Sequence, residues 1–155
     1  MYRRAPINGL INKHDIHFDD ETGETTLYFT PEINHCHTAG SLHGSGYFKL
    51  MDDAAFFAAQ AKVEDNFIFT VSFNTYLLKA IVPGVKLVAK GRTTSVSKSL
   101  VVAEAEIYTV VDNNLVAQGS GSFMKSPVSL DELRKKDDKE GGKKNMHHAP
   151  AGEIG

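Results

Sequence analysis

Residues 35–61, "HCHTAGSLHGSGYFKLMDDAAFFAAQA", join a loop rich in histidine and glycine to a segment with helical periodicity. From about Gly46 to Ala61, apolar residues recur at the three- and four-residue spacing of an amphipathic helix. Two adjacent aspartates, Asp52 and Asp53, lie within this apolar segment. The stretch therefore predicts one long helix, and it raises the question of which aspartate has a chemical role.

Strand-like segments flank the predicted helix on both sides. Two precede it, residues 10–18 and 25–30, and the "DDETGE" between them suits a hairpin turn. Four follow it, joined by short connectors, and they span residues 67–78, 85–97, 99–111 and 115–125. In residues 99–111, apolar and charged side chains alternate with the period of two that is typical of a strand with one wet face. We predict an α+β fold in which an antiparallel sheet of about five to six strands packs on one helix.

Composition and length bound the class of protein. The chain has 155 residues, the size of one domain, and a net charge of −2, which offers no basic field for nucleic acid. We find no apolar segment near the ~20 residues that span a bilayer, no signal-peptide pattern and a single cysteine, so we expect a cytoplasmic protein without nucleic-acid or membrane partners. We place a single domain at residues 1–126. Residues 127–155 are charged and poor in aromatic and branched side chains, which predicts a disordered tail.

The two aspartates face different sides of the predicted helix. At 100° per residue, Asp53 shares a side with Lys49 one turn earlier, and we expect it to be a solvated surface carboxylate. Asp52 shares a side with Phe48 and Ala55, where burying a carboxylate is costly unless it is hydrogen-bonded or has a pKa perturbed for a task. A purely structural hydrogen bond is the alternative. The pattern favours a functional role for Asp52.

Glycines surround the start of the predicted helix, in "HGSG" at residues 43–46. Glycine lets backbone N–H groups come close to a ligand, and the start of a helix presents unpaired N–H groups with a positive partial charge. This is the geometry of an oxyanion hole, which stabilises negative charge developing on a carbonyl oxygen. The same helix is thus predicted to carry both hydrogen-bond donors and a candidate catalytic carboxylate.

The segment "LHGSGYFKLMDDAAFFAA", in which Asp52 follows His43 by nine residues, resembles the "HGG, helix, Asp" signature of a known family. The family is that of the hotdog-fold acyl-CoA thioesterases, which includes phenylacetyl-CoA thioesterase and the thioesterase superfamily members. The strand segment "FTVSFNTYLLKAIVPG" and the later strands are similar to it as well, so the resemblance covers roughly residues 5–126. It implies a hotdog fold, with the sheet wrapped around a central helix. It also implies hydrolysis of an acyl-CoA to the free acid and coenzyme A, with no cofactor and no metal.

The resemblance assigns roles to individual residues. Asp52 is implied to be the catalytic carboxylate, as nucleophile or as general base. Gly44 is implied to supply a backbone N–H to the thioester oxygen, and His43 to hold the loop and help position the carbonyl or the water. Thr70 aligns with a residue that orients the water.

Two positions depart from the family pattern. His37 stands where relatives often carry an asparagine that polarises the thioester, and Ser45 replaces the second glycine of the signature. A neutral imidazole can donate one hydrogen bond as an amide does, so we keep His37 among the catalytic candidates. Both departures favour an alternative function, a non-catalytic sensor or carrier that binds acyl-CoA. A hotdog dehydratase or hydratase is a further alternative, against which the spacing of His43 and Asp52 argues.

Coenzyme A carries phosphates that need cationic partners. Family residues near the turn after residues 85–97 and on the last strand contact coenzyme A, which makes Arg92, Lys98 and Lys125 candidates, although a solvated charged face is the plainer interpretation. Relatives form dimers, commonly paired into tetramers, with sites at the subunit interface. One sheet with an uncovered edge is consistent with that assembly, so we expect a homodimer or homotetramer.

A metal site is the competing interpretation of the histidine-rich loop. Zinc ligands usually come as a short pair such as Cys-x2-Cys with a second pair at a distance, and His35, Cys36 and His37 lack that spacing. Adjacent residues on an extended chain point to opposite sides, so neither histidine is aimed to activate Cys36 as a nucleophile. We therefore predict no metal and treat Cys36 as a small apolar residue.

Overall fold

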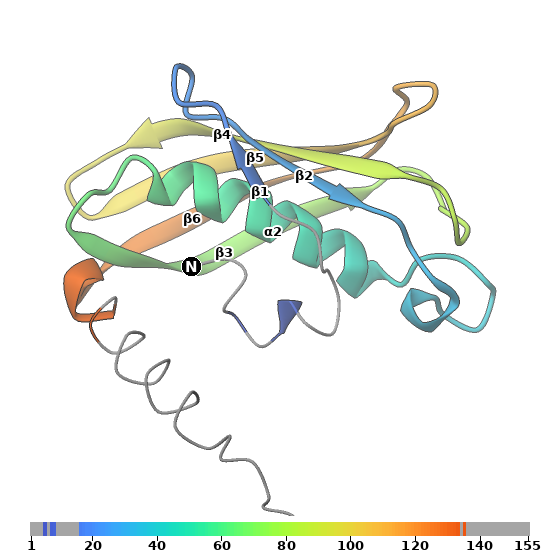
Figure 1. Cartoon of the computed structure of the whole chain (residues 1–155), viewed down its shortest axis with the longest axis horizontal. Coiled ribbons are helices and arrows are strands. Elements are labelled where there is room, and N and C mark those ends of the chain that lie inside the picture. The colour runs from blue at the N-terminus through green and yellow to red at the C-terminus, as the bar shows by residue number, and fades with distance from the viewer. Residues whose placement is uncertain (1–4, 6, 9–15, 134, 136–155) are drawn as a thin grey trace, which may run out of the picture.

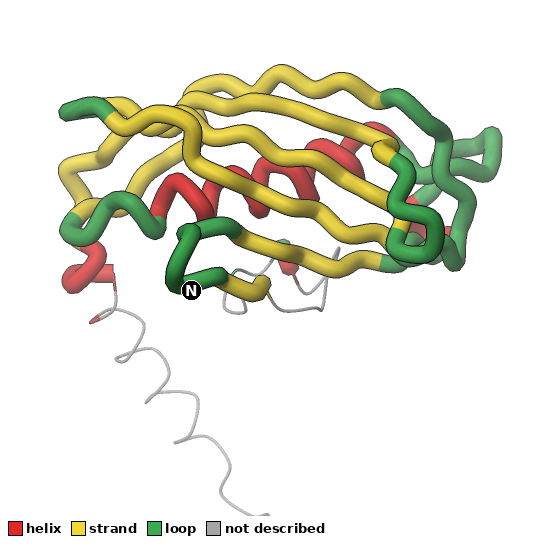
Figure 2. The backbone as a smooth tube through the Cα atoms, turned by 90° about the horizontal axis from the view of Figure 1, so that it is seen from above, coloured by secondary structure: helices red, strands yellow, loops and turns green. Residues whose placement is uncertain are grey.

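The computed structural model describes residues 5, 7, 8, 16–133 and 135. Figures 1 and 2 show one sheet that curves over a single long helix, α2, which spans Gly44–Gln60. A short 3-10 helix, η2 (Ile33–His35), lies in the loop before α2. The strands are β1 (Ile16–Phe18), β2 (Thr25–Phe29), β3 (Asn66–Leu77), β4 (Leu87–Val96), β5 (Leu100–Thr109) and β6 (Leu115–Ser129). The predicted α+β architecture is confirmed.

The sheet has six strands in the order β1-β2-β4-β5-β6-β3, and every neighbouring pair is antiparallel. β1 and β3 form its two edges. In β5 the predicted alternation is confirmed, because alternate residues from Val101 to Ile107 are buried while Glu104 and Glu106 stay partly exposed. The predicted hairpin is confirmed where β1 pairs with β2. Residues 10–15 of its predicted first strand lie outside the described residues.

Small residues let α2 approach the sheet closely. Ala54, Ala55, Ala58 and Ala59 are fully buried on the helix face toward the sheet. A Cβ atom built on Gly91 of β4 would lie 2.2 Å from the carbonyl oxygen of Ala54, so only glycine fits there. The Thr25 hydroxyl of β2 donates to the same carbonyl at 2.6 Å, and the helix backbone therefore rests almost directly on the strands.

The end of α2 is tied to the start of β3 by one side chain. Gln60 is 9% exposed, and its amide nitrogen donates to the carbonyls of Val63 at 3.1 Å and Asn66 at 3.0 Å. Its side-chain oxygen accepts from the Ile68 amide at 3.1 Å. A buried amide whose donors and acceptor are all used fixes the turn between the two elements. The position of β3 relative to α2 is thus set by hydrogen bonds rather than by apolar packing alone.

The structure differs from the sequence-based boundaries in two places, at the start of the helix and at the end of the domain. The helix begins at Gly44, two residues before the predicted start, so the glycines of "HGSG" form its first turn. β6 continues to Ser129, residues 130–133 are helical and Leu130 is buried, all beyond the predicted boundary at 126. The rest of the predicted tail, apart from residue 135, lies outside the described residues. No helix in the described part of the chain is long and apolar enough to cross a membrane.

Candidate active site

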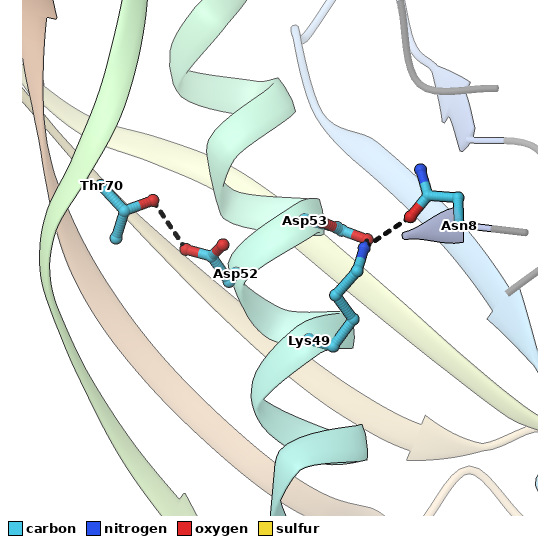
Figure 3. Close-up of polar contacts among 5 residues, drawn as sticks. All are labelled: Asn8, Lys49, Asp52, Asp53 and Thr70. Atoms are coloured by element: carbon cyan, nitrogen blue, oxygen red, sulfur yellow. Dashed lines mark hydrogen bonds and ion pairs between the residues drawn. The ribbon is translucent and has the colours of Figure 1, made fainter. Parts of the chain in front are cut away.

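Asp52 lies on the side of α2 that faces the edge strand β3 (Figure 3). The Thr70 hydroxyl of β3 donates a hydrogen bond of 2.9 Å to Oδ1 of Asp52. Burial raises the pKa of the Asp52 carboxyl, and the Thr70 hydrogen bond and the charge of Lys49 oppose that rise. A carboxylate that is desolvated, held by one hydroxyl and still partly exposed has the properties of a general base or nucleophile.

A β-bulge in β3 explains why Thr70 points at the helix. The register between β3 and β6 shifts at Val71, with Thr70 opposite Phe123 before it and Phe73 opposite Gly121 after it. Alternate residues of a regular strand face the same side, so Thr70 and Phe73 would face opposite sides without the extra residue. The bulge brings both side chains to the helix side of the sheet. It also re-aims the strand beside the catalytic candidate.

Asp53 faces the other side of α2 and makes different contacts (Figure 3). Its carboxylate forms an ion pair with Lys49, one turn earlier, as the helical spacing predicted. The Lys49 ammonium also donates to the side-chain oxygen of Asn8 at 2.7 Å, and Asn8 is 5% exposed. The prediction that Asp53 is solvated is wrong, because its side chain is only 14% exposed. Asn8 lies over this side of the helix, which the periodicity of α2 alone does not reveal.

The helix start is capped by His43. Its Nδ1 accepts from the Ser45 amide at 3.1 Å and lies 2.8 Å from the Ser45 hydroxyl, while its backbone N–H donates to the His35 carbonyl at 3.0 Å. This arrangement agrees with the loop-holding role implied for His43. Gly44 is the first residue of the helix, so its N–H is not used by the helix itself. Ser45, which replaces a glycine of the family signature, is part of the cap and does not disturb the helix.

The two halves of the candidate site are separated within one copy of the chain. Gly44 precedes Asp52 by eight residues, which corresponds to about 12 Å along a helix axis. A thioester carbonyl is far smaller than this distance. One carbonyl therefore cannot accept from the Gly44 amide and meet the Asp52 carboxylate of the same protomer.

His37 is not brought to Asp52 by any contact of the described residues. Its side chain is exposed in the loop before α2, its Nδ1 accepts from the Ala39 amide at 3.1 Å, and its own amide donates to the Ser41 carbonyl at 2.9 Å. Cys36 is partly buried, and its Sγ lies 3.5 Å from the Glu32 carbonyl oxygen. Among the residues that the structure describes, no three His, Cys, Asp or Glu side chains are grouped so that they could hold a metal ion.

The three candidate cations for coenzyme A lie in two places. Arg92 of β4 is exposed and forms an ion pair with Glu104 of β5, on the sheet face away from α2. Lys98 is exposed in the turn between β4 and β5, and the Lys125 amide donates to the Ser99 carbonyl of that turn at 2.9 Å. Lys98 and Lys125 therefore belong to the same end of the sheet, and Arg92 lies nearer the middle of its outer face.

Sequence reasoning missed Phe73, a side chain that packs between β3 and α2 one helical turn from the catalytic candidate. Its ring meets the ring of Phe48, at a centroid distance of 5.8 Å in an edge arrangement. A signal was present in "QGSGS", where two glycines alternate on the strand that faces β3. The phase of Phe73 depends on the bulge at Val71, which propensities alone do not locate.

Comparisons with known proteins agree with this arrangement. A family model described as the thioesterase superfamily matches residues 39–115, which include the capped helix start, Asp52 and Thr70. A search of curated proteins by sequence found no match. Many solved structures are similar in fold.

Three of these structures are informative. The PaaI protein from the phenylacetic acid degradation operon of Escherichia coli has a TM-score of 0.74 and 20% identity, over 83% of this chain and 90% of that one. Zebrafish thioesterase superfamily member 2 has a TM-score of 0.72 and 18% identity, over 80% and 90%. A Streptococcus mutans protein solved with bound acetyl-CoA has a TM-score of 0.65 and 15% identity, over 74% and 90%.

The structural similarities establish the fold, and the family model matches the segment that contains the capped helix start, the aspartate and the strand that follows. The resemblance seen in the sequence is thereby confirmed. This chain belongs to the thioesterase superfamily and has the hotdog fold.

Proposed function

We propose that the protein is an acyl-CoA thioesterase in which Asp52 drives hydrolysis of the thioester. The observation that carries this proposal is the half-buried Asp52 carboxylate, which is held by Thr70 and has a raised pKa, on a helix whose start offers backbone N–H groups. Membership of the thioesterase superfamily supports the reaction class, and the acetyl-CoA in a structurally similar protein supports the ligand class.

The chemistry needs a base, an oxyanion donor and a water molecule. As general base, ionised Asp52 takes a proton from water while the water oxygen attacks the thioester carbon. Negative charge then develops on the carbonyl oxygen, where the Gly44 amide stabilises it. The C–S bond breaks, the sulfur of coenzyme A receives a proton, and the products are the free acid and the thiol. As nucleophile, Asp52 would instead attack the carbon directly, and water would hydrolyse the resulting anhydride.

The separation of Gly44 and Asp52 indicates that each site is shared by two copies of the chain. We propose a homodimer in which the Gly44 amide of one protomer and the Asp52 carboxylate of the other act on the same carbonyl. The edge strand β3 supplies the means, because along its 12 residues one side has no neighbouring strand in the described part of the chain. Val71 and Tyr76 on this strand are 52% and 62% exposed, which is high for apolar and aromatic side chains.

Antiparallel pairing of β3 with its copy would make one continuous sheet. It would also set the two α2 helices side by side in opposite directions, so that the start of one comes nearer the middle of the other. Pairing of two such dimers into a tetramer is a further part of the proposal.

Two lysines at one end of the sheet, of which Lys98 is exposed and Lys125 partly buried, are the proposed partners of the coenzyme A phosphates. Lys98 and Lys125 belong to that end, and Arg92 is a weaker candidate because Glu104 already matches its charge. In the loop before α2, Nδ1 of His37 accepts from the Ala39 amide, so that Nε2 is the ring nitrogen available to a ligand. The histidine at position 37, where relatives often carry an asparagine, is the feature that favours the second candidate function, a protein that binds acyl-CoA without cleaving it.

Steady-state hydrolysis of a panel of acyl-CoA thioesters tests the function. We expect the wild type to hydrolyse at least one of them and Asp52→Asn to lose roughly a thousandfold in kcat/KM, since the amide neither accepts a proton nor attacks carbon. Binding of acyl-CoA without hydrolysis by the wild type would favour the second candidate. An Asp52→Asn variant that retains full activity would refute the role of Asp52.

Mixing two inactive variants tests the shared site. Gly44→Pro removes the amide proton at the first helical position, where proline is well tolerated, and Gly44→Ala keeps it as a control. We expect Gly44→Pro alone to lose about a hundredfold or more. Subunit exchange between Gly44→Pro and Asp52→Asn should restore about a quarter of wild-type activity, because half of the dimers are mixed and each mixed dimer has one intact site. No recovery after verified exchange would place Gly44 and Asp52 in separate functions.

A further inference from the structure

The ring of Phe73 lies flat against β6 over two glycines. A Cβ atom built on Gly121 would lie 2.3 Å from Cδ2 of Phe73, and one built on Gly119 would lie 2.6 Å from Cε1. These atoms belong to opposite edges of the ring, so the ring spans both positions. Any other residue at either glycine would push Phe73 away from the sheet.

The same ring is adjacent to the catalytic candidate. Phe48, its edge-on partner, precedes Asp52 by one helical turn, about 6 Å along the axis. Thr70 and Phe73 are brought to the same side of β3 by the bulge at Val71. Phe48 and Phe73 therefore form an aromatic contact between α2 and β3, one helical turn from Asp52 on the side toward the start of the helix.

A second aromatic group lies on the other side of Asp52 and packs against the core. Phe56, one turn after Asp52, contacts Phe67 at 5.7 Å and Phe123 at 6.0 Å between ring centroids. Phe123 is fully buried, whereas Phe48 is 42% exposed. An acyl chain attached to a carbon at Asp52 must lie within a few bonds of that residue. The more exposed of the two aromatic surfaces is the one that contains Phe48, against which Phe73 packs.

We propose that Phe73 determines acyl-chain specificity: its ring fills a recess beside Asp52 that is floored by Gly119 and Gly121, and it thereby restricts the enzyme to short acyl groups. The inference rests on the proposed thioesterase function and adds the class of acyl group to it. Removal of the ring leaves a recess with Gly119 and Gly121 at its floor and the ring of Phe48 beside it. Such a recess accepts the distal methylenes of a longer chain.

Hydrolysis of acetyl-, butanoyl-, octanoyl- and decanoyl-CoA by wild type, Phe73→Ala and Phe73→Leu tests the proposal. The wild type should prefer acetyl- or butanoyl-CoA. Because each newly buried methylene contributes about fourfold, two or three of them should raise the octanoyl to butanoyl ratio of kcat/KM by about 15- to 60-fold in Phe73→Ala. Phe69→Ala is the matched control, since Phe69 lies on the same strand and is 42% exposed on the other face, and its ratio should stay within twofold.

The outcomes separate the specificity role from the function itself. A folded Phe73→Ala variant with the wild-type preference would overturn the inference while leaving the thioesterase function in place. If Phe73→Ala does not fold, Phe73→Leu decides, and an unchanged ratio there counts against the proposal.

A wild type that hydrolyses none of the thioesters would refute the proposed function. The recess is then tested by calorimetric titration of Asp52→Asn, with and without Phe73→Ala, with butanoyl- and octanoyl-CoA. The double variant should bind octanoyl-CoA at least 10-fold more tightly than Asp52→Asn does, with butanoyl-CoA changed less than threefold. Equal binding by the two variants, or no binding by either, would overturn the proposal.

Discussion

Asp52 and Asp53 are the same residue type at adjacent positions of one helix, yet their surroundings differ in kind. Asp52 faces β3, accepts a hydrogen bond from the neutral Thr70 hydroxyl and has a raised pKa because it is desolvated. Asp53 faces the other side of α2 and is paired with Lys49, which also donates to Asn8. Among the described residues, Asp52 therefore has no cation in direct contact, whereas Asp53 has Lys49.

This difference supports the proposal that the two sides of one helix serve chemistry and stability separately. A desolvated carboxylate that is only hydrogen-bonded to a neutral hydroxyl keeps its basicity and gains from accepting a proton. A carboxylate in an ion pair has its charge matched and acts as a structural group. The role of each aspartate follows from the element that its face meets, and not from burial alone, because both are partly buried.

The largest expected effect is a reversal of the two roles in paired variants. Asp52→Asn should lower kcat/KM roughly a thousandfold, and Asp53→Asn should leave it within about threefold. Stability should change in the opposite pattern, with Asp53→Asn costing about 1–2 kcal/mol because Lys49 loses its partner. Urea denaturation and hydrolysis assays on the same preparations measure both quantities. Comparable losses of activity in the two variants would remove the distinction between the faces.

The difference in stability between Asp52→Asn and the wild type should depend on pH in a defined direction. The folded-state pKa of Asp52 is raised, so a proton on Asp52 stabilises the fold below the usual range of a carboxyl pKa, and that contribution is lost as pH rises through the folded pKa. The neutral asparagine avoids this loss. Asp52→Asn should therefore equal the wild type at the acid end and be more stable near neutral pH. Urea midpoints at several pH values give the sign directly.

Removal of the Thr70 hydroxyl is the next largest change. Thr70→Val keeps the shape but deletes the donor to Asp52, so we expect about a 10-fold fall in kcat/KM, equivalent to about 1.4 kcal/mol. Loss of the donor also removes an influence that lowers the pKa of Asp52, so the acid limb of the pH–rate profile should move to higher pH. Thr70→Ser retains the hydroxyl and should keep both values near wild type. A Thr70→Val profile that overlays the wild type would contradict a positioning role.

The charge of Lys49 links the two faces and has a smaller expected effect. Its ammonium is paired with Asp53 but still lowers the pKa of Asp52. Replacing it in Lys49→Met should shift the acid limb of kcat/KM upward, so that activity falls a fewfold on the acid side and recovers at higher pH. The double variant Lys49→Met/Asp53→Asn removes the unpaired carboxylate that the single change leaves behind, and it should retain the upward shift. An acid limb that returns to wild type in the double variant would trace the effect to Asp53.

The smallest effect extends the comparison to the cations. Arg92 is an exposed cation already matched by Glu104, so Arg92→Ala should change KM for acyl-CoA by less than about twofold and stability by no more than about 0.5 kcal/mol. Lys98→Ala should raise KM severalfold, and more at low salt, since a phosphate contact is screened by ions. KM values at two ionic strengths separate the two cases. A larger effect from Arg92→Ala than from Lys98→Ala would reverse the assignment.

The sequence was informative wherever a period or a charge pattern extends over a whole element. The helix, the strands after it and the opposite directions of Asp52 and Asp53 follow from periods of 3.6 and 2. The family signature added the loop-holding role of His43 and the expectation for Thr70. The pairing of Lys49 with Asp53 was visible as a one-turn spacing.

What could not be predicted depends on contacts between distant segments. The cover of Asn8 over Lys49, 41 positions apart, makes Asp53 a largely buried residue, and no local pattern reports it. The bulge at Val71 is fixed by pairing with β6 and not by the composition of β3, so the strand alternation beyond Thr70 could not be phased. Phe73 was therefore missed although both of its glycine neighbours are visible in the sequence.

The Gln60 side chain has a consequence for the energetics of turnover. It joins the end of α2 to Asn66 and Ile68 at the start of β3. The two elements that it holds together carry Asp52 and Thr70. Side chains on two elements that are held together in this way need little reorganisation when charge moves in the reaction. The Ile68 amide, bonded to Gln60, should exchange with deuterium only through global unfolding, and a faster exchange in Gln60→Ala would measure how much of the catalytic alignment is already present before substrate arrives.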